Sequence, residues 1–251
     1  MIRAIARLDV KNNYVIKGIH LEGLRKVGDP NEMALRYYEA GVDEIVFMDA
    51  VASLYDRNNL FHIIEQAVRK VFVPIVIGGG LRTVEDVSRA LDAGADKVIV
   101  NTGAVRNILL VTEIARKFGS QCLIGSIEAK REPAGGWQVK VNNGRDSTGL
   151  EVVSWARQLV DAGIGELMVT SVDQEGTRNG FDIALVETLQ ANTLRPIIVS
   201  GGYGRPEHIR ELFKKVVPSA IAFASVLHYK QASLQELKSV IQQNQNEGQA
   251  A

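Results

Sequence analysis

The sequence has little that would suit an oxidising environment, a membrane or a polyanionic partner. It has one cysteine, Cys122, so an internal disulfide is excluded, and the apolar run around it predicts a buried structural thiol in a reducing cytoplasm. No apolar stretch approaches about 18 residues, and Arg3 and Arg7 interrupt the first one, so we expect neither a membrane span nor a secretion signal. The formal net charge of +0 gives no sign of nucleic-acid binding. The four histidines lack ligand-like spacing, and we assign no metal.

A short motif that ends in glycines occurs twice. Residues 74–80 read Pro-Ile-Val-Ile-Gly-Gly-Gly, and residues 196–202, which begin 122 positions later, read Pro-Ile-Ile-Val-Ser-Gly-Gly. A β-branched run of this kind is typical of a buried parallel strand, and glycines at its carboxyl end let backbone N–H groups approach a phosphate closely. Each motif taken alone also fits a simple tight turn. Because the spacing is close to half of the 251 residues, we infer an internal repeat.

Apolar runs alternate with amphipathic segments along the chain. Eight runs have the character of strands, at residues 4–9, 44–49, 75–78, 97–101, 122–128, 166–171, 197–200 and 220–224. Helical spacing is seen between them, for example over residues 84–93 and 150–162, and Pro30 and Pro206 suit the first position of two further helices. The pattern predicts an α/β fold, a single (β/α)8 TIM barrel over residues 1–251 built from two half-barrel repeats, with a frayed tail at 244–251. A doubly wound open sheet is the alternative.

Other landmarks support the repeat. Three further pairs stand at spacings of 122, 119 and 124 residues: Glu44–Asp49 with Glu166–Ser171, Leu8–Lys11 with Ile127–Lys130, and Asn101 with Ser225. Each half also has one long connection after its first strand, at residues 11–29 and 129–148, and long loops in a compact barrel are usually functional. The second connection contains Trp137–Val141 followed by Asn143-Gly144, which predicts a β-hairpin.

In such a barrel, the carboxyl ends of the strands and the following loops form the catalytic face. Two phosphate cradles, one in each half, are expected from Gly79, Gly80, Asn101 and Thr102, and from Gly201, Gly202, Ala224 and Ser225. Candidate substrate-contacting residues at the same face are Lys17, Asp49, Thr170 and Glu175. The repeat places Asp9 and Glu128 opposite each other between the cradles, which suits general acid–base chemistry on a long ligand with a phosphate at each end. Taken singly, either carboxylate also fits a solvated loop residue or a helix cap.

Together these motifs resemble the cyclase subunit of imidazole glycerol phosphate synthase, from histidine biosynthesis. The resemblance covers nearly the whole chain and rests on these segments: Leu8–Lys11, Val15–Gly18, Gly28–Pro30, Asp43-Glu44 with Asp49, Gly78–Gly80, Gly94–Lys97 with Asn101, Phe118–Gln121, Ala129–Arg131, Thr148-Gly149, Thr170-Ser171 with Gly176-Thr177, Ser200–Gly202 and Ala224-Ser225. The repeat also fits the sister isomerase of the pathway, but Phe118–Gln121 and Gly176-Thr177 resemble the cyclase.

The resemblance implies a lyase that needs no cofactor. With ammonia it would convert the bisphosphate phosphoribulosyl formimino-carboxamide ribotide into imidazole glycerol phosphate and aminoimidazole carboxamide ribotide. Asp9 resembles the family's first acid–base residue, and Lys17 resembles the lysine of its mobile first loop. Ammonia would come from a glutaminase subunit docked on the amino-terminal face, and would travel along the barrel axis. The charged ring at that entrance is matched by Arg3, Glu44, Lys97 and Glu166, which by chemistry alone also fit a structural salt-bridge ring.

Two positions depart from the family pattern. Glu128 stands where the family usually has the aspartate of Ile-Asp-Ala-Lys, and Glu175 replaces the second aspartate of Asp-x-Asp-Gly-Thr. Each change keeps the charge and adds one methylene, and a shift of about 1 Å can cost on the order of 10²-fold in rate. Two alternatives therefore stay open: a paralogous subunit that channels ammonia to an amidotransferase for amidino groups of surface sugars, and a non-catalytic phosphate-binding scaffold. The presence of Asp9, Lys17 and both cradles argues against the scaffold.

Overall fold

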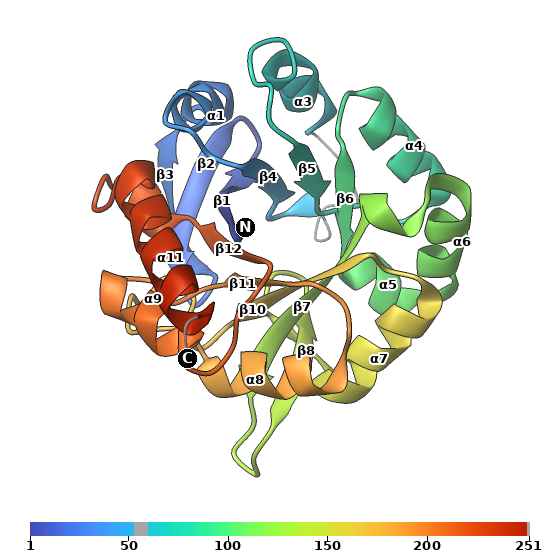
Figure 1. Cartoon of the computed structure of the whole chain (residues 1–251). Helices are drawn as coiled ribbons and strands as arrows, with labels where there is room; N and C mark the ends of the chain where they lie inside the picture. The colour runs from blue at the N-terminus through green and yellow to red at the C-terminus, as the bar shows by residue number, and fades with distance from the viewer. Residues whose placement is uncertain (53–59, 250–251) are drawn as a thin grey trace.

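The computed structural model describes residues 1–52 and 60–249. In this part of the chain, eight parallel strands close into a barrel inside a ring of helices (Figure 1). Their order around the barrel follows the sequence: β1 (Arg3–Lys11), β4 (Glu44–Asp49), β5 (Ile75–Gly78), β6 (Lys97–Val100), β7 (Leu123–Arg131), β10 (Glu166–Ser171), β11 (Ile197–Ser200) and β12 (Ala220–Phe223). Pairing of β12 with β1 closes the ring. The predicted TIM barrel is confirmed, and the open-sheet alternative is wrong.

Helices cover the outside of the barrel. They are α1 (Pro30–Glu39), α3 (Phe61–Ala67), α4 (Val84–Asp92), α5 (Thr102–Arg106), α6 (Leu109–Phe118), the 3₁₀ helix η1 (Ser120–Cys122), α7 (Val152–Ala162), α8 (Ile183–Asn192), α9 (Pro206–Phe213), α10 (Ser225–His228) and α11 (Leu234–Gln249). The predicted first-position prolines of α1 and α9 are confirmed. Helix α7 begins two residues later than predicted, because Leu150 and Glu151 complete a strand and the Glu151 carboxylate caps the helix by accepting from the Val153 and Ser154 N–H groups.

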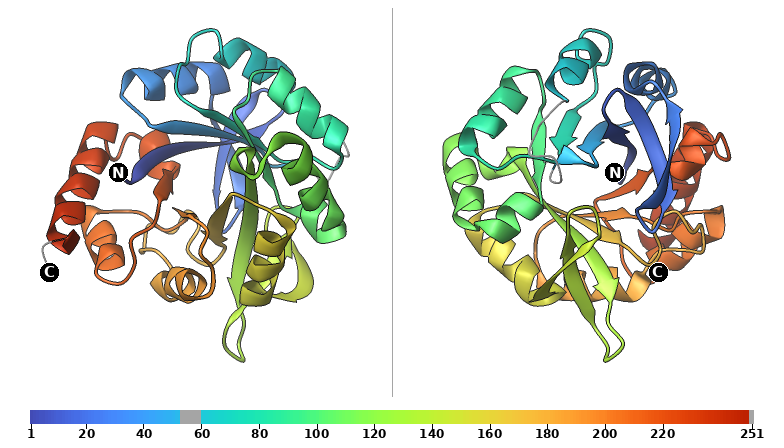
Figure 2. Two further views of the ribbon diagram at one scale, coloured as in Figure 1. Left: turned by 45° about the vertical axis from the view of Figure 1, so that its right-hand side comes forward. Right: turned by 180° about the vertical axis from the view of Figure 1, so that it is seen from behind.

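Antiparallel ribbons occupy both long connections. The predicted hairpin is confirmed as β8 (Trp137–Val141) and β9 (Asp146–Glu151), which extend β7. The turn between β7 and β8, at residues 132–136, projects past the helices (Figure 2). The first connection also forms a ribbon, β2 (Tyr14–Ile19) and β3 (Glu22–Gly28), which the sequence patterns did not reveal. The His20 N–H donates to the Glu175 carbonyl at 2.8 Å, and Asn143 Nδ2 donates to the Leu21 carbonyl at 3.2 Å. These bonds hold the first ribbon against loops of the second half.

The barrel interior is layered, because every second residue of a strand points inward. Its middle is an apolar layer formed by Ile5, Val46, Val76, Ile99, Ile124, Met168, Ile198, Ala220 and Ala222. Two residues earlier on four of these strands stand Arg3, Glu44, Lys97 and Glu166, and two residues later on β1 stands Arg7. The interior therefore has a charged layer at its amino-terminal end and polar groups at its carboxyl-terminal end.

The backbone supports the repeat and corrects one of its pairs. Asn101 has φ −134° and ψ −86°, and Ala224 has φ −132° and ψ −85°, immediately before the short helices α5 and α10. The equivalent of Asn101 is therefore Ala224, and that of Thr102 is Ser225. The sequence pairing of Asn101 with Ser225 was wrong by one residue, because the loop lengths of the two halves differ.

The polar tail expected to fray at residues 244–251 continues helix α11 as far as Gln249, and residues 250–251 lie outside the described part. Asn244 is buried, and its Nδ2 donates to the Val240 carbonyl at 2.7 Å. Cys122 is buried, as expected, and burial raises its pKa. Among the described residues, no helix has the length and apolar character needed to span a membrane.

Candidate active site

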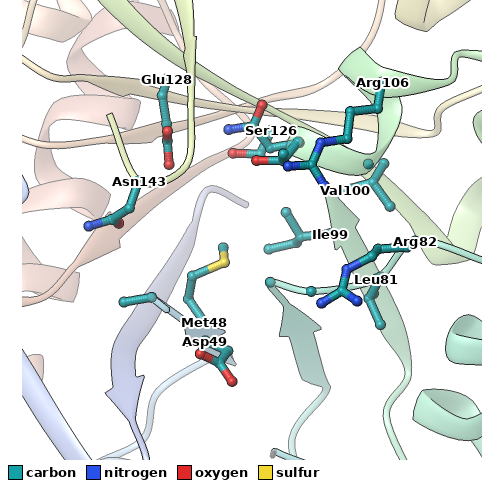
Figure 3. Close-up of a pocket in the computed structure, with 16 residues that line it drawn as sticks. Met48, Asp49, Leu81, Arg82, Ile99, Val100, Arg106, Ser126, Glu128 and Asn143 are labelled. Atoms are coloured by element: carbon teal, nitrogen blue, oxygen red, sulfur yellow. The ribbon is translucent and has the colours of Figure 1, made fainter. Parts of the chain in front are cut away.

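The first predicted cradle lines a pocket at the carboxyl ends of β4, β5 and β6 (Figure 3). All four of its residues are there, together with Asp49 and Glu128. Gly79 has φ +89°, and a Cβ at this position would lie 2.3 Å from the Asp49 carbonyl oxygen, so only glycine fits the turn. Arg82 and Arg106 also line the pocket, with their guanidinium groups turned toward it, although sequence reasoning had not selected them. The pocket thus combines cations with a close backbone approach, which suits an anion.

The second predicted cradle lines a smaller pocket at the ends of β11 and β12. Gly201, Gly202, Ala224 and Ser225 meet there, with Glu175 beside them. Gly202 has φ +104°, and a Cβ there would lie 1.9 Å from the Gly180 carbonyl oxygen. Next to this pocket is a wider cleft under the first ribbon, and its lining includes the cationic residues Lys17, Arg25, Lys26 and Arg178. The structure therefore provides two glycine-lined pockets at equivalent places of the two halves.

Asp9 and Glu128 come from strands that lie between the two pockets around the ring, and Glu128 also lines the first pocket. Their strands, β1 and β7, are four places apart in the ring of eight, so the two carboxyl groups come from opposite walls of the barrel. Both side chains are buried, with 5% and 9% exposure. Glu128 Oε2 accepts a hydrogen bond from the Gly144 N–H at 2.7 Å, so the Glu128 carboxyl group reaches the turn between β8 and β9. Within β10, Thr170 is the register partner of Glu128.

Buried cations surround Asp9. Arg7 Nε donates to Asp9 Oδ1 at 2.8 Å, and Lys17 Nζ donates to Asp9 Oδ2 at 3.2 Å. Lys17 also pairs with Glu175, which is buried in the loop after β10. Arg7 was not among the candidate residues of the sequence, although it lies two positions before Asp9 and shares its strand face. The structure thus joins the predicted Asp9, Lys17 and Glu175 in one buried ion-pair network and adds Arg7 to it.

The two opposed carboxyl groups differ in their affinity for protons. At Asp9, burial disfavours the charged form, but the positive charges of Arg7 and Lys17 outweigh it and lower the pKa to about 2. At Glu128, burial dominates over the Gly144 N–H and the more distant Arg7, and raises the pKa to about 7. At neutral pH, Asp9 is therefore ionised, whereas Glu128 can both hold and release a proton. Two carboxyl groups with such different pKa values are suited to distinct roles in proton transfer.

The raised pKa of Glu128 predicts a pH-dependent stability. As pH rises from 4.5 to about 7, an unfolded glutamate ionises while the buried one stays protonated, so folding loses free energy over this window. Glu128→Gln removes the titrating group. Its melting temperature relative to the wild type should therefore be higher at pH 8 than at pH 5, by about 5 °C. Equal differences at the two pH values, measured by calorimetry, would contradict the assignment.

The four predicted ring residues form a closed network at the amino-terminal end of the barrel. Arg3 Nη1 pairs with Glu44 Oε2 at 2.7 Å, and Arg3 also pairs with Glu166. Lys97 Nζ lies 3.1 Å from Glu44 Oε2 and 3.3 Å from Glu166 Oε2. Two cations therefore alternate with two carboxylates across the interior. In the described residues, no group of three or more His, Cys, Asp or Glu side chains is arranged to hold a metal ion.

The fold and this site define a (β/α)8-barrel protein that has a network of buried ionisable groups at the face where enzymes of this class carry out their chemistry. Residues 3–233 match the model of the family described as "Histidine biosynthesis protein". The chain belongs to this family.

Curated relatives match this chain over most of its length. A protein of Legionella pneumophila named imidazole glycerol phosphate synthase subunit HisF is 53% identical over 206 residues, which are 82% of this chain and 97% of the relative. Proteins with the same name from Streptococcus gordonii and Hydrogenobaculum sp. are each 43% identical, over 96% of this chain and 95% and 96% of their own lengths. These relatives are named as subunits, which implies a partner subunit. The predicted family is confirmed, and with it the cyclase-subunit function in histidine biosynthesis and the lyase class.

Proposed function

We propose that the chain uses ammonia to cyclise and cleave phosphoribulosyl formimino-carboxamide ribotide, giving imidazole glycerol phosphate and aminoimidazole carboxamide ribotide. The observation that carries this proposal is the placement of Asp9 and Glu128 on opposite walls, between two glycine-lined pockets. A ligand with a phosphate at each end would lie across the mouth with its reacting centre between the carboxyl groups. The experiment is turnover of this bisphosphate by the purified chain with an ammonium salt as the nitrogen source. If the purified chain does not turn over the bisphosphate, the proposal is contradicted.

The different surroundings of the carboxyl groups suggest separate roles. Asp9 stays ionised and would act as the base or would stabilise positive charge that develops on the substrate. Glu128 has a pKa near neutrality and would deliver or accept the proton on the other side. Lys17 lies on the first ribbon and is already paired with Asp9 and Glu175, so it would contact the ligand where the ribbon meets the barrel. Asp49 and Thr170 would complete the walls on either side.

We also propose that the amino-terminal face binds a glutaminase subunit, so that ammonia enters through the ring. Large apolar side chains are exposed in segments that precede barrel strands, and these segments all lie at that end of the barrel: Met1, Phe72, Leu194 and Val217. Leu194 is 103% exposed and Phe72 is 75% exposed. Apolar side chains around a charged opening are typical of a protein interface. The expected location in the cytoplasm stays a prediction.

Lys97→Met tests the role of the ring. The substitution removes the cation that pairs with both Glu44 and Glu166, and the partner's ammonia would enter at this point. We expect glutamine-dependent turnover with the glutaminase to fall about tenfold, while turnover with ammonium salt changes much less. Equal losses in the two assays would reduce the ring to a feature of stability. The matched control is Lys238→Met, which removes a lysine of the outer helix α11 that pairs with Asp43.

The paralogous ammonia-channelling subunit is the second candidate, and the glutamates at positions 128 and 175 favour it. A subunit of this kind would release ammonia to another enzyme rather than use it on the bisphosphate. The ammonium assay separates the two candidates: the cyclase turns over the bisphosphate, whereas the channelling subunit supports only glutamine hydrolysis by its partner.

A further inference from the structure

Arg7 lies across the barrel interior. Its backbone belongs to β1, yet its Nη1 donates to Thr170 Oγ1 on β10 at 3.0 Å and to Ser200 Oγ on β11 at 3.2 Å. Around the closed ring, β11 is two strands from β1 and β10 is three. The guanidinium group must therefore cross toward the opposite wall, between the apolar layer that contains Ile5 and the carboxyl groups above. Only 3% of Arg7 is exposed.

The buried charges form a balanced set in which Arg7 is essential. Arg7 and Lys17 supply two positive charges, and Asp9 and Glu175 supply two negative charges. Lys17 is shared between the two carboxylates, whereas within the described part of the chain Arg7 forms an ion pair with Asp9 alone. Without Arg7, a single ammonium group would face two buried carboxylates, and ionisation of both would be costly.

The two cations are attached to the molecule differently. Lys17 is on the first ribbon, which leaves the barrel after β1 and contacts the loop after β10. Arg7 is on the same barrel strand as Asp9, two residues away, and its other end is fixed by hydroxyl groups of two further barrel strands. A movement of the ribbon that carried Lys17 away would leave the Arg7–Asp9 pair in place.

We propose that Arg7 is a positioning residue, which fixes the Asp9 carboxylate to the barrel independently of the first ribbon and so frees Lys17 to turn from Asp9 to the substrate. The proposal rests on the proposed reaction, and it adds to it a residue that does not touch the ligand. It explains why an arginine lies directly above the apolar layer: Nε of its planar fork donates to a carboxylate and Nη1 to two hydroxyl groups, a spread of donors that the single ammonium nitrogen of lysine lacks.

The first measurement does not depend on turnover. The titration of the Asp9 carboxyl carbon is followed by NMR in protein labelled at aspartate, with the Asp9→Asn spectrum for assignment. The charged and titratable groups around Asp9 are Arg7 on β1, Lys17 on β2, Glu128 on β7 and His228 on α10, with Glu175 after β10 joined to Asp9 through Lys17. In the wild type, Asp9 should stay ionised down to pH 4. In Arg7→Met, its midpoint should rise by about one pH unit or more.

The second measurement is kinetic. If Arg7 positions Asp9, Arg7→Met should lower kcat on the order of 10²-fold, change KM by less than about threefold, and shift the acidic limb of the pH profile upward. Arg7→Lys keeps the charge but loses the fork, so its kcat and its Asp9 midpoint should lie between those of the wild type and Arg7→Met. This variant also serves if Arg7→Met fails to fold. Arg131→Met, which removes a guanidinium paired with Asp182 outside the interior, is the control and should leave the Asp9 midpoint unchanged.

The outcomes separate the inference from the proposed function. If the wild type does not turn over the bisphosphate, the proposed function fails, and the Asp9 titration still decides whether Arg7 holds the carboxylate. If the wild type is active but Arg7→Met and Arg7→Lys leave the Asp9 midpoint and the acidic limb unchanged, Arg7 is only a structural residue and the inference is overturned. A uniform loss of rate at every pH leads to the same conclusion.

Discussion

Asp9→Asn should abolish ammonia-dependent turnover, with a fall of about 10²- to 10⁴-fold, which is the range for removal of a general acid or base. The asparagine amide keeps the shape of the side chain but can neither carry the negative charge nor exchange the proton. Binding of the bisphosphate should persist, because the cradle residues Gly79 and Gly202 lie in pockets on either side of Asp9. Rates with ammonium salt and calorimetric binding of the bisphosphate measure the two effects separately.

The loss of the Asp9 charge also affects stability, and the experiment must allow for this. Arg7 would then lose its ion-pair partner while Lys17 keeps Glu175, and a buried cation without its partner is destabilising. Folding of the variant is therefore checked by circular dichroism at the assay temperature. Asp146→Asn, on the exposed strand β9, provides the same substitution outside the network as a control. A folded Asp9→Asn protein that keeps most of the wild-type rate would remove Asp9 from the acid–base chemistry.

The barrel could be predicted from the sequence because its strands are buried on both faces. Such strands appear as short β-branched runs, and their strict alternation with helices allows few topologies. The repeat of the 74–80 motif at 196–202 relates the two halves, and this relation alone places Asp9 and Glu128 on opposite walls. Internal symmetry supplied the long-range information that local patterns lack.

The first ribbon could not be predicted for a related reason. Its turn places His20 and Leu21 at φ +51° and +64°. These residues seldom adopt this conformation, and no local sequence pattern predicts it. The ribbon is held instead by distant partners, including the Glu175 carbonyl and Asn143. The second ribbon has Asn143-Gly144 at its turn, which favours positive φ, and it was visible in the sequence.

The placement of Arg7 was hidden by the burial of β1 on both faces. Residues 3–10 of this strand include Arg3, Arg7 and Asp9 among apolar neighbours, and all three have the parity of the interior residue Ile5. In a strand that is buried on both sides, the alternation of odd and even positions does not show which face is the barrel interior. Once the fold is known, the same spacing assigns Arg3 to the amino-terminal end of the barrel interior and Arg7 and Asp9 to its carboxyl-terminal end.

Glu128→Asp should lower the rate by about tenfold or more in a chain that already has measurable turnover with ammonium salt. The physical reason is the hydrogen bond from the Gly144 N–H to Glu128 Oε2 at 2.7 Å. The loop that presents this N–H has positive φ at Asn142, Asn143 and Gly144, so its shape is adapted to the longer side chain. Aspartate would withdraw the carboxylate by about 1.5 Å, the length of one carbon–carbon bond, and leave the Gly144 N–H without its acceptor.

The sign of this effect distinguishes the two proposed functions. In a cyclase adapted to glutamate, the shorter acid is displaced from the substrate, and turnover falls. In a channelling subunit that has lost the cyclisation, aspartate restores the side chain usual in the family between intact pockets, and turnover would rise from an undetectable level. Single-turnover rates at a fixed concentration of free ammonia give the comparison, with Asp161→Glu on the outer helix α7 as a control for a one-methylene change at an exposed position. Because Glu128 is held by Gly144 in a loop shaped for it, we expect the fall, and a gain in turnover would contradict the cyclase function.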